Sequence, residues 1–129
     1  MIVLDENIPD SQRHLLRGWR IRVHQIGHET GRSGMKDEEI VPLLHSLRTP
    51  TFFTRDLGFY RTAFCHPGYC IVCLDVGQYE VASFVRRMLR HGNFRHRAHR
   101  IGKVIRASHP GIQVLELHGA KRIDIAWNE

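Results

Sequence analysis

Long hydrophobic runs are absent from this chain of 129 residues. The apolar run that opens it, residues 1–4, has no basic flank, whereas a secretory signal carries roughly 7–15 apolar residues and a membrane span about 18. We therefore expect a cytoplasmic protein with no membrane partner. Because 42% of the residues are hydrophobic and 25% are charged, we expect one folded domain over residues 1–129.

Cysteine is scarce, and its three residues, Cys65, Cys70 and Cys73, are an odd number. In a chain without an export signal we expect reduced thiols. Together with His66 they could be read as a zinc site. However, Cys70 and Cys73 are an odd number of positions apart in a predicted strand, so their side chains leave it on opposite faces. Buried, unreactive thiols are the favoured interpretation.

Catalytic signatures with a fixed spacing are also missing. Gly31 and Gly34 are not followed by the Lys-Ser/Thr pair of a phosphate-binding loop. His24 and His28 are four residues apart, but they flank Gly27 in a region predicted to be strand and loop. No Ser–His–Asp arrangement stands out. The sequence therefore argues against these classes of enzyme.

Apolar residues are spaced as in alternating strands and helices. Short, nearly continuous runs predict strands, and recurrence every three or four positions predicts helices. Asn7 and Asp37 stand where N-caps of the first two helices would, and residues 118–121 fit a hairpin turn. The alternation predicts an α/β sandwich with a mainly parallel sheet. The predicted strands are 1–5, 21–26, 51–54, 69–75, 103–107, 113–117 and 122–127, and the predicted helices are 8–19, 40–47 and 81–89.

Carboxylates mark the ends of these elements. Asp5, Asp56 and Asp75 each end a predicted strand, and Asp37 heads a predicted helix. Right-handed crossovers bring the carboxyl ends of parallel strands to one edge of a sheet, where α/β proteins bind ligands. Each acid alone could serve only its local backbone, as a helix cap or a strand end. Together, the four share one predicted edge.

Acids gathered at one edge call for a cation. Clustered carboxylates repel one another unless they share a proton or a cation, and Mg²⁺ or Mn²⁺ takes oxygen ligands together with substrate phosphates. A pair of such ions about 4 Å apart can activate a water in phosphodiester hydrolysis. In a chain of net charge +6, this indicates a nuclease whose metal ligands are Asp5, Asp37, Asp56 and Asp75.

Positive charge is concentrated late in the chain. Residues 86–106 contain eight Lys or Arg and no acid, which is typical of a phosphate-binding surface, an acidic-partner surface or a solvated helix face. Arg55, beside Asp56, is a further single candidate. The residues that we expect to contact RNA or a protein partner are Arg55, Arg86, Arg87, Arg90, Arg95, Arg97, Arg100 and Lys103.

Three segments have a familiar order and spacing: Leu-Asp-Glu-Asn-Ile-Pro at 4–9, Lys-Asp-Glu-Glu-Ile at 36–40 and Phe-Thr-Arg-Asp-Leu-Gly-Phe at 53–59. Over roughly its first 75–90 residues the chain resembles the compact PIN-like proteins related to VapC ribonuclease toxins. The resemblance implies a three-layer α/β/α fold, followed here by the predicted C-terminal β-hairpin, and Mg²⁺- or Mn²⁺-dependent cleavage of RNA. A cognate antitoxin is the implied protein partner, and a homodimer is allowed but required by no sequence feature.

The resemblance assigns the catalytic acids to Asp5, Asp37 and Asp56. Relatives commonly carry one more acid two residues after the last of these, where this chain has Gly58. Asp75, Glu6 or Glu39 could compensate for its loss, or the enzyme could use a single metal. The auxiliary candidates are Glu6, Asn7, Glu39 and Thr54.

Two other functions are compatible with the same residues. The first is a non-catalytic RNA- or partner-binding PIN-like module with a degraded metal site, a hypothesis that Gly58 motivates. The second is a phosphoacceptor receiver domain with Asp5 and Glu6 as the acidic pair, Asp56 as the acceptor and Lys103 as its lysine. The turn after Asp56 does not fit that pattern, and the net charge suits a polyanion better.

Overall fold

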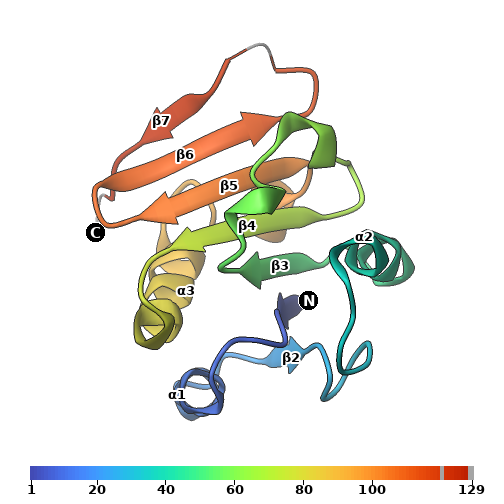
Figure 1. Ribbon diagram of the computed structural model, residues 1–129. Helices are drawn as coiled ribbons and strands as arrows, with labels where there is room; N and C mark the ends of the chain where they lie inside the picture. The colour runs from blue at the N-terminus through green and yellow to red at the C-terminus, as the bar shows by residue number, and fades with distance from the viewer. Residues whose placement is uncertain (120, 128–129) are drawn as a thin grey trace.

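The computed structural model describes residues 1–119 and 121–127 and has an α/β fold with one seven-stranded, mostly parallel sheet (Figure 1). This confirms the α/β class and the mainly parallel sheet expected from the sequence. The strands are β1 (Ile2–Leu4), β2 (Val23–Gln25), β3 (Thr51–Thr54), β4 (Cys70–Asp75), β5 (Lys103–Ser108), β6 (Gly111–Glu116) and β7 (Ile123–Ile125). The helices are α1 (Asp10–Gly18), α2 (Asp37–Ser46), α3 (Val81–Arg90) and α4 (Arg97–Arg100), with short 3₁₀ helices η1 (Leu57–Phe59), η2 (Thr62–Phe64) and η3 (Gln78–Glu80).

The order of the strands creates a branch point beside β1. The sheet runs β2-β1-β3-β4-β5-β6-β7, and β1 pairs in parallel with β2 on one side and β3 on the other. The chain therefore leaves β1 in one direction and later crosses over to its other side. Such a reversal opens a crevice at the carboxyl ends of the two inner strands, where α/β sheets bind ligands. We call this end of the parallel strands the carboxyl edge and the opposite end the amino edge.

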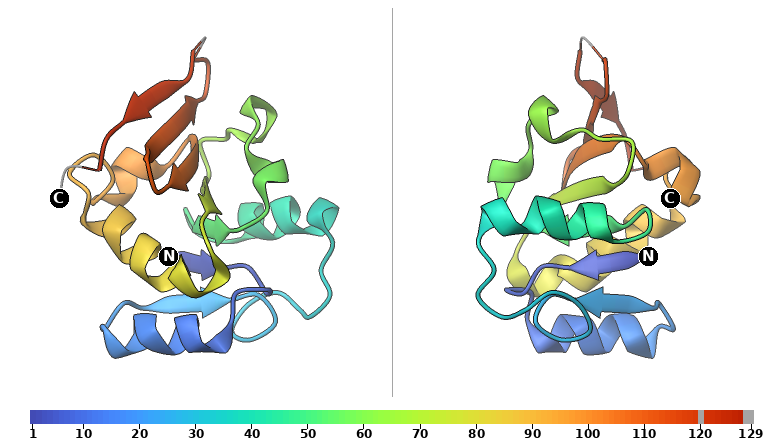
Figure 2. Two further views of the ribbon diagram at one scale, coloured as in Figure 1. Left: turned by 60° about the vertical axis from the view of Figure 1, so that its left-hand side comes forward. Right: turned by 90° about the vertical axis from the view of Figure 1, so that its right-hand side faces the viewer.

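Strand residues alternate between two buried clusters on the two faces of the sheet. Leu4 and Phe53 belong to one cluster, which also contains residues of α1 and α3, whereas Val3 and Phe52 belong to the other, which contains residues of α2. Figure 2 shows α2 lying apart from α1 and α3. Both faces of the central strands are thus dry, which explains their nearly continuous apolar sequence.

The cysteines are buried and unpaired. Cys70 and Cys73 belong to different clusters, so they cannot bind one zinc ion, as their spacing predicted. Burial raises the pKa of both thiols to about 12, and the reactive thiolate is therefore scarce at neutral pH.

Both predicted helix caps are wrong. Helix α1 begins after Pro9, whose carbonyl accepts from Gln12 N at 3.0 Å, and Asn7 is exposed two residues earlier. Lys36 is the N-cap of α2, so Asp37 is its first helical residue. In both helices the first residue after the N-cap is an aspartate, Asp10 in α1 and Asp37 in α2. The helix dipole favours a negative charge at this position.

The three carboxyl-terminal strands pair antiparallel with one another. Only two residues separate β5 from β6, and the two strands pair antiparallel from Ser108↔Gly111 onward. Strand β7 pairs antiparallel with β6; Ala120, in the predicted turn between them, lies outside the described residues. Among the described residues, no helix is long and apolar enough to cross a bilayer.

A buried amide ties the end of β1 to β2. Gln25 is fully buried, and its Nε2 donates to Asp5 O at 3.0 Å and to Ile8 O at 2.9 Å. These carbonyls belong to the turn between β1 and α1. Asp5 O also accepts from Ile8 N–H at 3.2 Å, so it is chiefly Ile8 O that depends on the Gln25 amide for a hydrogen bond in the interior. Gln25 therefore fixes the course of the chain just after Asp5.

We expect Gln25→Met to lower the free energy of unfolding by roughly 1–3 kcal/mol, because it removes the buried donor to Ile8 O and one of the two donors to Asp5 O. Urea denaturation followed by circular dichroism measures the change. Gln113→Met is the matched control, since this half-buried amide accepts one hydrogen bond from Arg106 and its loss should cost less. Equal costs for the two variants would contradict the role given to Gln25.

Candidate acidic site at the carboxyl edge

Asp5 follows β1 and is held by strand pairing. Its backbone N–H donates to Phe53 O at 3.0 Å, which continues the pairing of β1 with β3 by one residue. Its carboxylate turns towards β3, where Thr54 Oγ1 donates to Asp5 Oδ2 at 2.7 Å. The position of this acid therefore depends on the sheet itself and not on a loop.

Asp56 lies in a turn organised by Thr54. Its backbone N–H donates to Thr54 Oγ1 at 3.0 Å, and Gly58 N–H donates to Asp56 Oδ1 at 2.8 Å. The fully buried Thr54 hydroxyl thus accepts from the Asp56 backbone while it donates to the Asp5 carboxylate. One hydroxyl links the two acids, which gives the auxiliary residue Thr54 a structural role.

Asp37 comes to the same place from the start of α2. The loop before this helix is anchored beside β1, because Gly34 N–H donates to the two Glu6 oxygens at 2.9 and 3.1 Å. Glu39 holds the first turn of α2 by accepting from Lys36 N–H at 3.3 Å. Glu6 and Glu39, both auxiliary candidates, therefore position the segment that carries Asp37.

The three aspartates act on one another electrostatically. Burial raises the pKa of Asp5, against hydrogen bonds from Thr54 and from the Glu6 backbone, and the charge of Asp56 raises it further. Desolvation, the charge of Asp56 and a hydrogen bond with Asp56 raise the pKa of Asp37, and the charge of Asp5 adds to this effect. The sequence prediction that Asp5, Asp37 and Asp56 share one place is thus consistent with their mutual influence.

Asp75, the fourth predicted ligand, is engaged by a different partner. Arg106 Nη2 lies 2.5 Å from Asp75 Oδ2, and Arg106 Nη1 donates to Gln113 Oε1 at 2.8 Å. Asp75 pairs across the sheet with Ser108, two residues beyond Arg106, so the arginine projects on the same face as the acid. This ion pair was not predicted from the sequence, because it depends on the register of β4 and β5.

The predicted nucleic-acid residues do not form one surface beside the acids. Arg55 is exposed next to Asp56, and its Nε donates to Val76 O at 2.9 Å. The remainder lie on α3 or in the segment between α3 and β5, and this segment reaches the amino edge where β5 begins. Arg86 stacks on Trp19 at 3.7 Å, Arg87 lies over Phe84 and Trp127, Arg90, Arg95 and Arg97 are exposed, and Arg100 is buried.

The receiver-domain hypothesis does not fit this geometry. It requires Lys103 close to Asp56, but Lys103 is the first residue of β5 and Asp56 lies beyond the carboxyl end of β3. These positions are at opposite edges of the sheet. The ammonium of Lys103 instead donates to His99 O at 2.5 Å.

The donors suit a divalent cation in kind, although they are not arranged as a finished cage. Within residues 1–119 and 121–127, no three His, Cys, Asp or Glu side chains are grouped as metal ligands. The Asp5 and Asp56 oxygens are instead turned to Thr54 and Gly58. Carboxylate oxygens match Mg²⁺ or Mn²⁺ and not softer metals, and positive charge would remove the repulsion that raises the two pKa values.

No protein-family model, no curated protein and no solved structure matches the chain. Any assignment of function therefore rests on the residues of the site.

We expect Asp37→Asn to raise the melting temperature at pH 7, in EDTA, by about 2 °C, a small rise because solvent screens an exposed charge. A raised pKa means that the folded state holds its proton more tightly, so the wild type gains stability as the pH falls. The difference should therefore shrink towards pH 3.8, the ordinary value for Asp. Differential scanning fluorimetry between pH 4 and pH 8 measures it.

Asp10→Asn is the matched control, because Asp10 is likewise the first residue of a helix but has no neighbouring acid among its contacts. It loses a favourable interaction with the helix dipole and an exposed contact with His28, whose Nε2 lies 3.9 Å from Asp10 Oδ1, and should lower the melting temperature slightly. A lower melting temperature for Asp37→Asn as well would show that repulsion at this site is negligible.

Proposed function

We propose that the protein is a Mg²⁺- or Mn²⁺-dependent endoribonuclease of PIN-like fold, with Asp5, Asp37 and Asp56 as the metal-binding acids. The observation that carries the proposal is the mutual influence of three carboxylates from separate segments at the β1–β3 branch point. The resemblance in sequence supplies the three-layer α/β/α arrangement and an antitoxin as partner. The C-terminal β6–β7 hairpin and a cytoplasmic location join the proposal from the sequence pattern alone.

The residues of the chain have distinct tasks in this proposal. Thr54 orients Asp5 and Asp56 through its single hydroxyl, and Glu6 holds the loop that presents Asp37. Arg55 is exposed, and its Nε donates to Val76 O. Because it adjoins Asp56 in the sequence, it is the first candidate to contact a substrate phosphate. A bound ion supplies the positive charge that activates water and neutralises the phosphate.

We expect the wild type to cut a mixed pool of single-stranded and structured RNA in Mg²⁺ or Mn²⁺ and not in EDTA. Asp5→Asn and Asp56→Asn should each lower the rate by about 100-fold or more, a loss typical of removing one group that stabilises the transition state. Gel electrophoresis of end-labelled RNA measures the rate, and Asp10→Asn should cut normally. Cleavage that survives both site substitutions would refute the proposal.

A second function is favoured by the environment of the missing acid. Gly58 has no carboxylate, and Asp75 is compensated by Arg106, so three acids remain where relatives commonly have more. With this depletion the chain could be a non-catalytic module that binds RNA or a protein partner through the same fold. Wild-type protein that binds RNA but does not cut it in any divalent metal would favour this alternative.

We expect Gly58→Asp to restore metal-dependent cleavage if the site is degraded. A Cβ at this position would lie 2.9 Å from Asp56 Oδ1, so the Asp56 carboxylate would have to turn away from the Gly58 N–H that now binds it. The substitution therefore frees one acid and adds another. Gly58→Asn, which crowds Asp56 equally but adds no charge, is the control, and equal activity of the two variants would contradict a missing-ligand explanation.

A further inference from the structure

Charge is divided between the two edges of the parallel sheet. Loops that follow parallel strands carry most of the carboxylates, and loops that precede them carry most of the unpaired cations, so the two kinds collect at opposite edges. Asp5, Glu6, Asp37, Glu38, Glu39, Asp56 and Asp75 belong to the carboxyl edge, whereas Arg20, Arg22, Arg48, Arg95, Arg97 and Lys103 belong to the amino edge.

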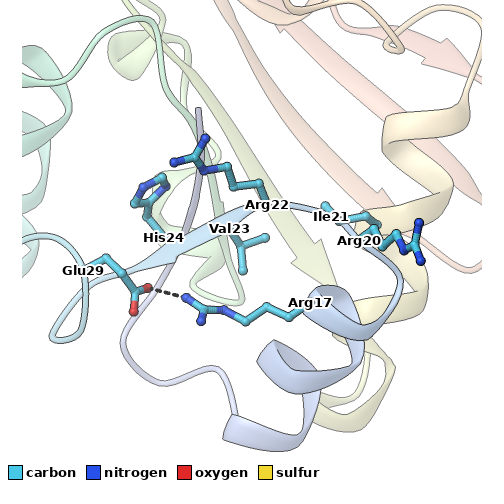
Figure 3. A pocket seen from close by; sticks show the side chains of 7 residues that line it. All are labelled: Arg17, Arg20, Ile21, Arg22, Val23, His24 and Glu29. Carbon is cyan, nitrogen blue, oxygen red and sulfur yellow. Dashed lines mark ion pairs between the residues drawn. The ribbon is translucent and has the colours of Figure 1, made fainter.

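Two adjoining pockets lie beside the outer strand β2 and include residues of the amino edge. One, of about 430 Å³, is lined by the residues of Figure 3, where Arg22 and His24 project from the same side of β2. The other, of about 480 Å³, is lined by Arg97 and Arg100 together with the start of β1. Arg22 and His24 line both pockets, so the two adjoin, and we call the pair of pockets together the basic groove.

Three guanidinium groups of the basic groove lack a compensating charge among the described residues. Arg20, Arg22 and Arg97 are exposed, and within the described part of the chain none of them has a side-chain hydrogen bond or ion pair. The one carboxylate in the lining is Glu29, which is already bound by Arg13 and by Arg17, the latter at 3.2 Å. The groove therefore offers three free guanidinium groups to an anion.

The backbone that carries these arginines is held in place. Buried Arg100 donates from Nε to Thr51 Oγ1 at 3.0 Å and from Nη1 to Phe94 O at 2.8 Å, which fixes the segment containing Arg97. Arg20 has a positive φ of 64°, and its N–H donates to Arg17 O at 2.9 Å in the turn that ends α1. A ligand therefore meets cations whose backbone is already ordered, which lowers the entropy cost of binding.

A phosphate backbone fits the basic groove better than a protein does. Arginine forks match phosphate oxygens in pairs, and phosphate contacts alone can supply most of the affinity for a nucleic acid. A protein interface usually needs a buried apolar anchor. Among the described residues that line the groove, only Met1, at 36%, is an exposed large hydrophobic side chain.

We propose that the basic groove binds the phosphate backbone of RNA at the edge of the sheet opposite the acidic site. The proposal rests on the proposed function only in naming RNA as the polyanion. Met1 lines the groove and Asp5 belongs to the acidic site, so the two are four residues, or about 13 Å, apart along β1. A single RNA strand can therefore contact both edges, and the groove would select substrates longer than a few nucleotides.

The test is fluorescence anisotropy of a labelled single-stranded RNA of about twelve nucleotides with the full chain, in EDTA so that cleavage plays no part. We expect Arg22→Glu and Arg97→Glu each to weaken binding about tenfold. Each should also reduce the slope of log K against log salt by about 0.7–1, the effect of one lost phosphate contact. Circular dichroism checks that the variants are folded.

The matched control is Arg61→Glu, which makes the same change in net charge at an exposed arginine outside the groove. It should leave the affinity within about twofold of wild type. Equal weakening by all three substitutions would assign the effect to net charge and overturn the proposal, as would tighter groove-dependent binding of poly-L-glutamate than of RNA. Because RNA binding does not require catalysis, a protein that shows groove-dependent binding but no cleavage would refute the proposed nuclease function and leave the RNA-binding proposal standing.

Discussion

The parallel pairing of β1 with both β2 and β3 is the constraint on which the rest of the molecule depends. It places Asp5 beside Thr54 and directs the loops after β1 and β3 to one edge. The same pairing sends every loop that precedes a parallel strand to the other edge. The acidic site and the basic groove are therefore two consequences of one topology, because residues far apart in the chain are sorted by whether they follow or precede a strand.

The acidic site is held together against its own electrostatics. Burial and like charges raise the pKa values of Asp5 and Asp37. At pH values above the ordinary titration range of aspartate, the charged forms of these two acids therefore lower the stability of the folded state. Hydrogen bonds from Thr54 and from backbone N–H groups offset part of this loss, and buried Gln25 fixes the turn after Asp5. Such local conflict inside an otherwise consistent fold is typical of functional sites, where stability is given up for chemistry.

Much of the fold could be predicted from the sequence because the inner strands are buried on both faces. The nearly continuous apolar run at residues 69–75 identifies β4 directly, and two phenylalanines flanked by β-branched threonines at residues 51–54 identify β3. The edge on which Asp5 and Asp56 meet follows from strand order and the handedness of crossovers. The predictions that failed concern features that depend on strand register and on side-chain packing. Asp75 is paired with Arg106 on the neighbouring strand, and buried Arg100 donates to the backbone of its own segment. The N-caps differ by two residues and one residue from the predicted ones, because Pro9 and Lys36 take these positions.

The central claim is that Asp5, Asp37 and Asp56 form a binding site for a divalent cation. Crystals of the full chain soaked in Mn²⁺ and measured for anomalous scattering test it most directly, because the signal reports the ion without requiring activity. The account predicts a peak between these three side chains, at about 2.0–2.3 Å from at least two of their oxygens, and its loss in Asp5→Asn. No peak there, or a peak confined to other acids such as Asp75 and Glu80, would contradict it.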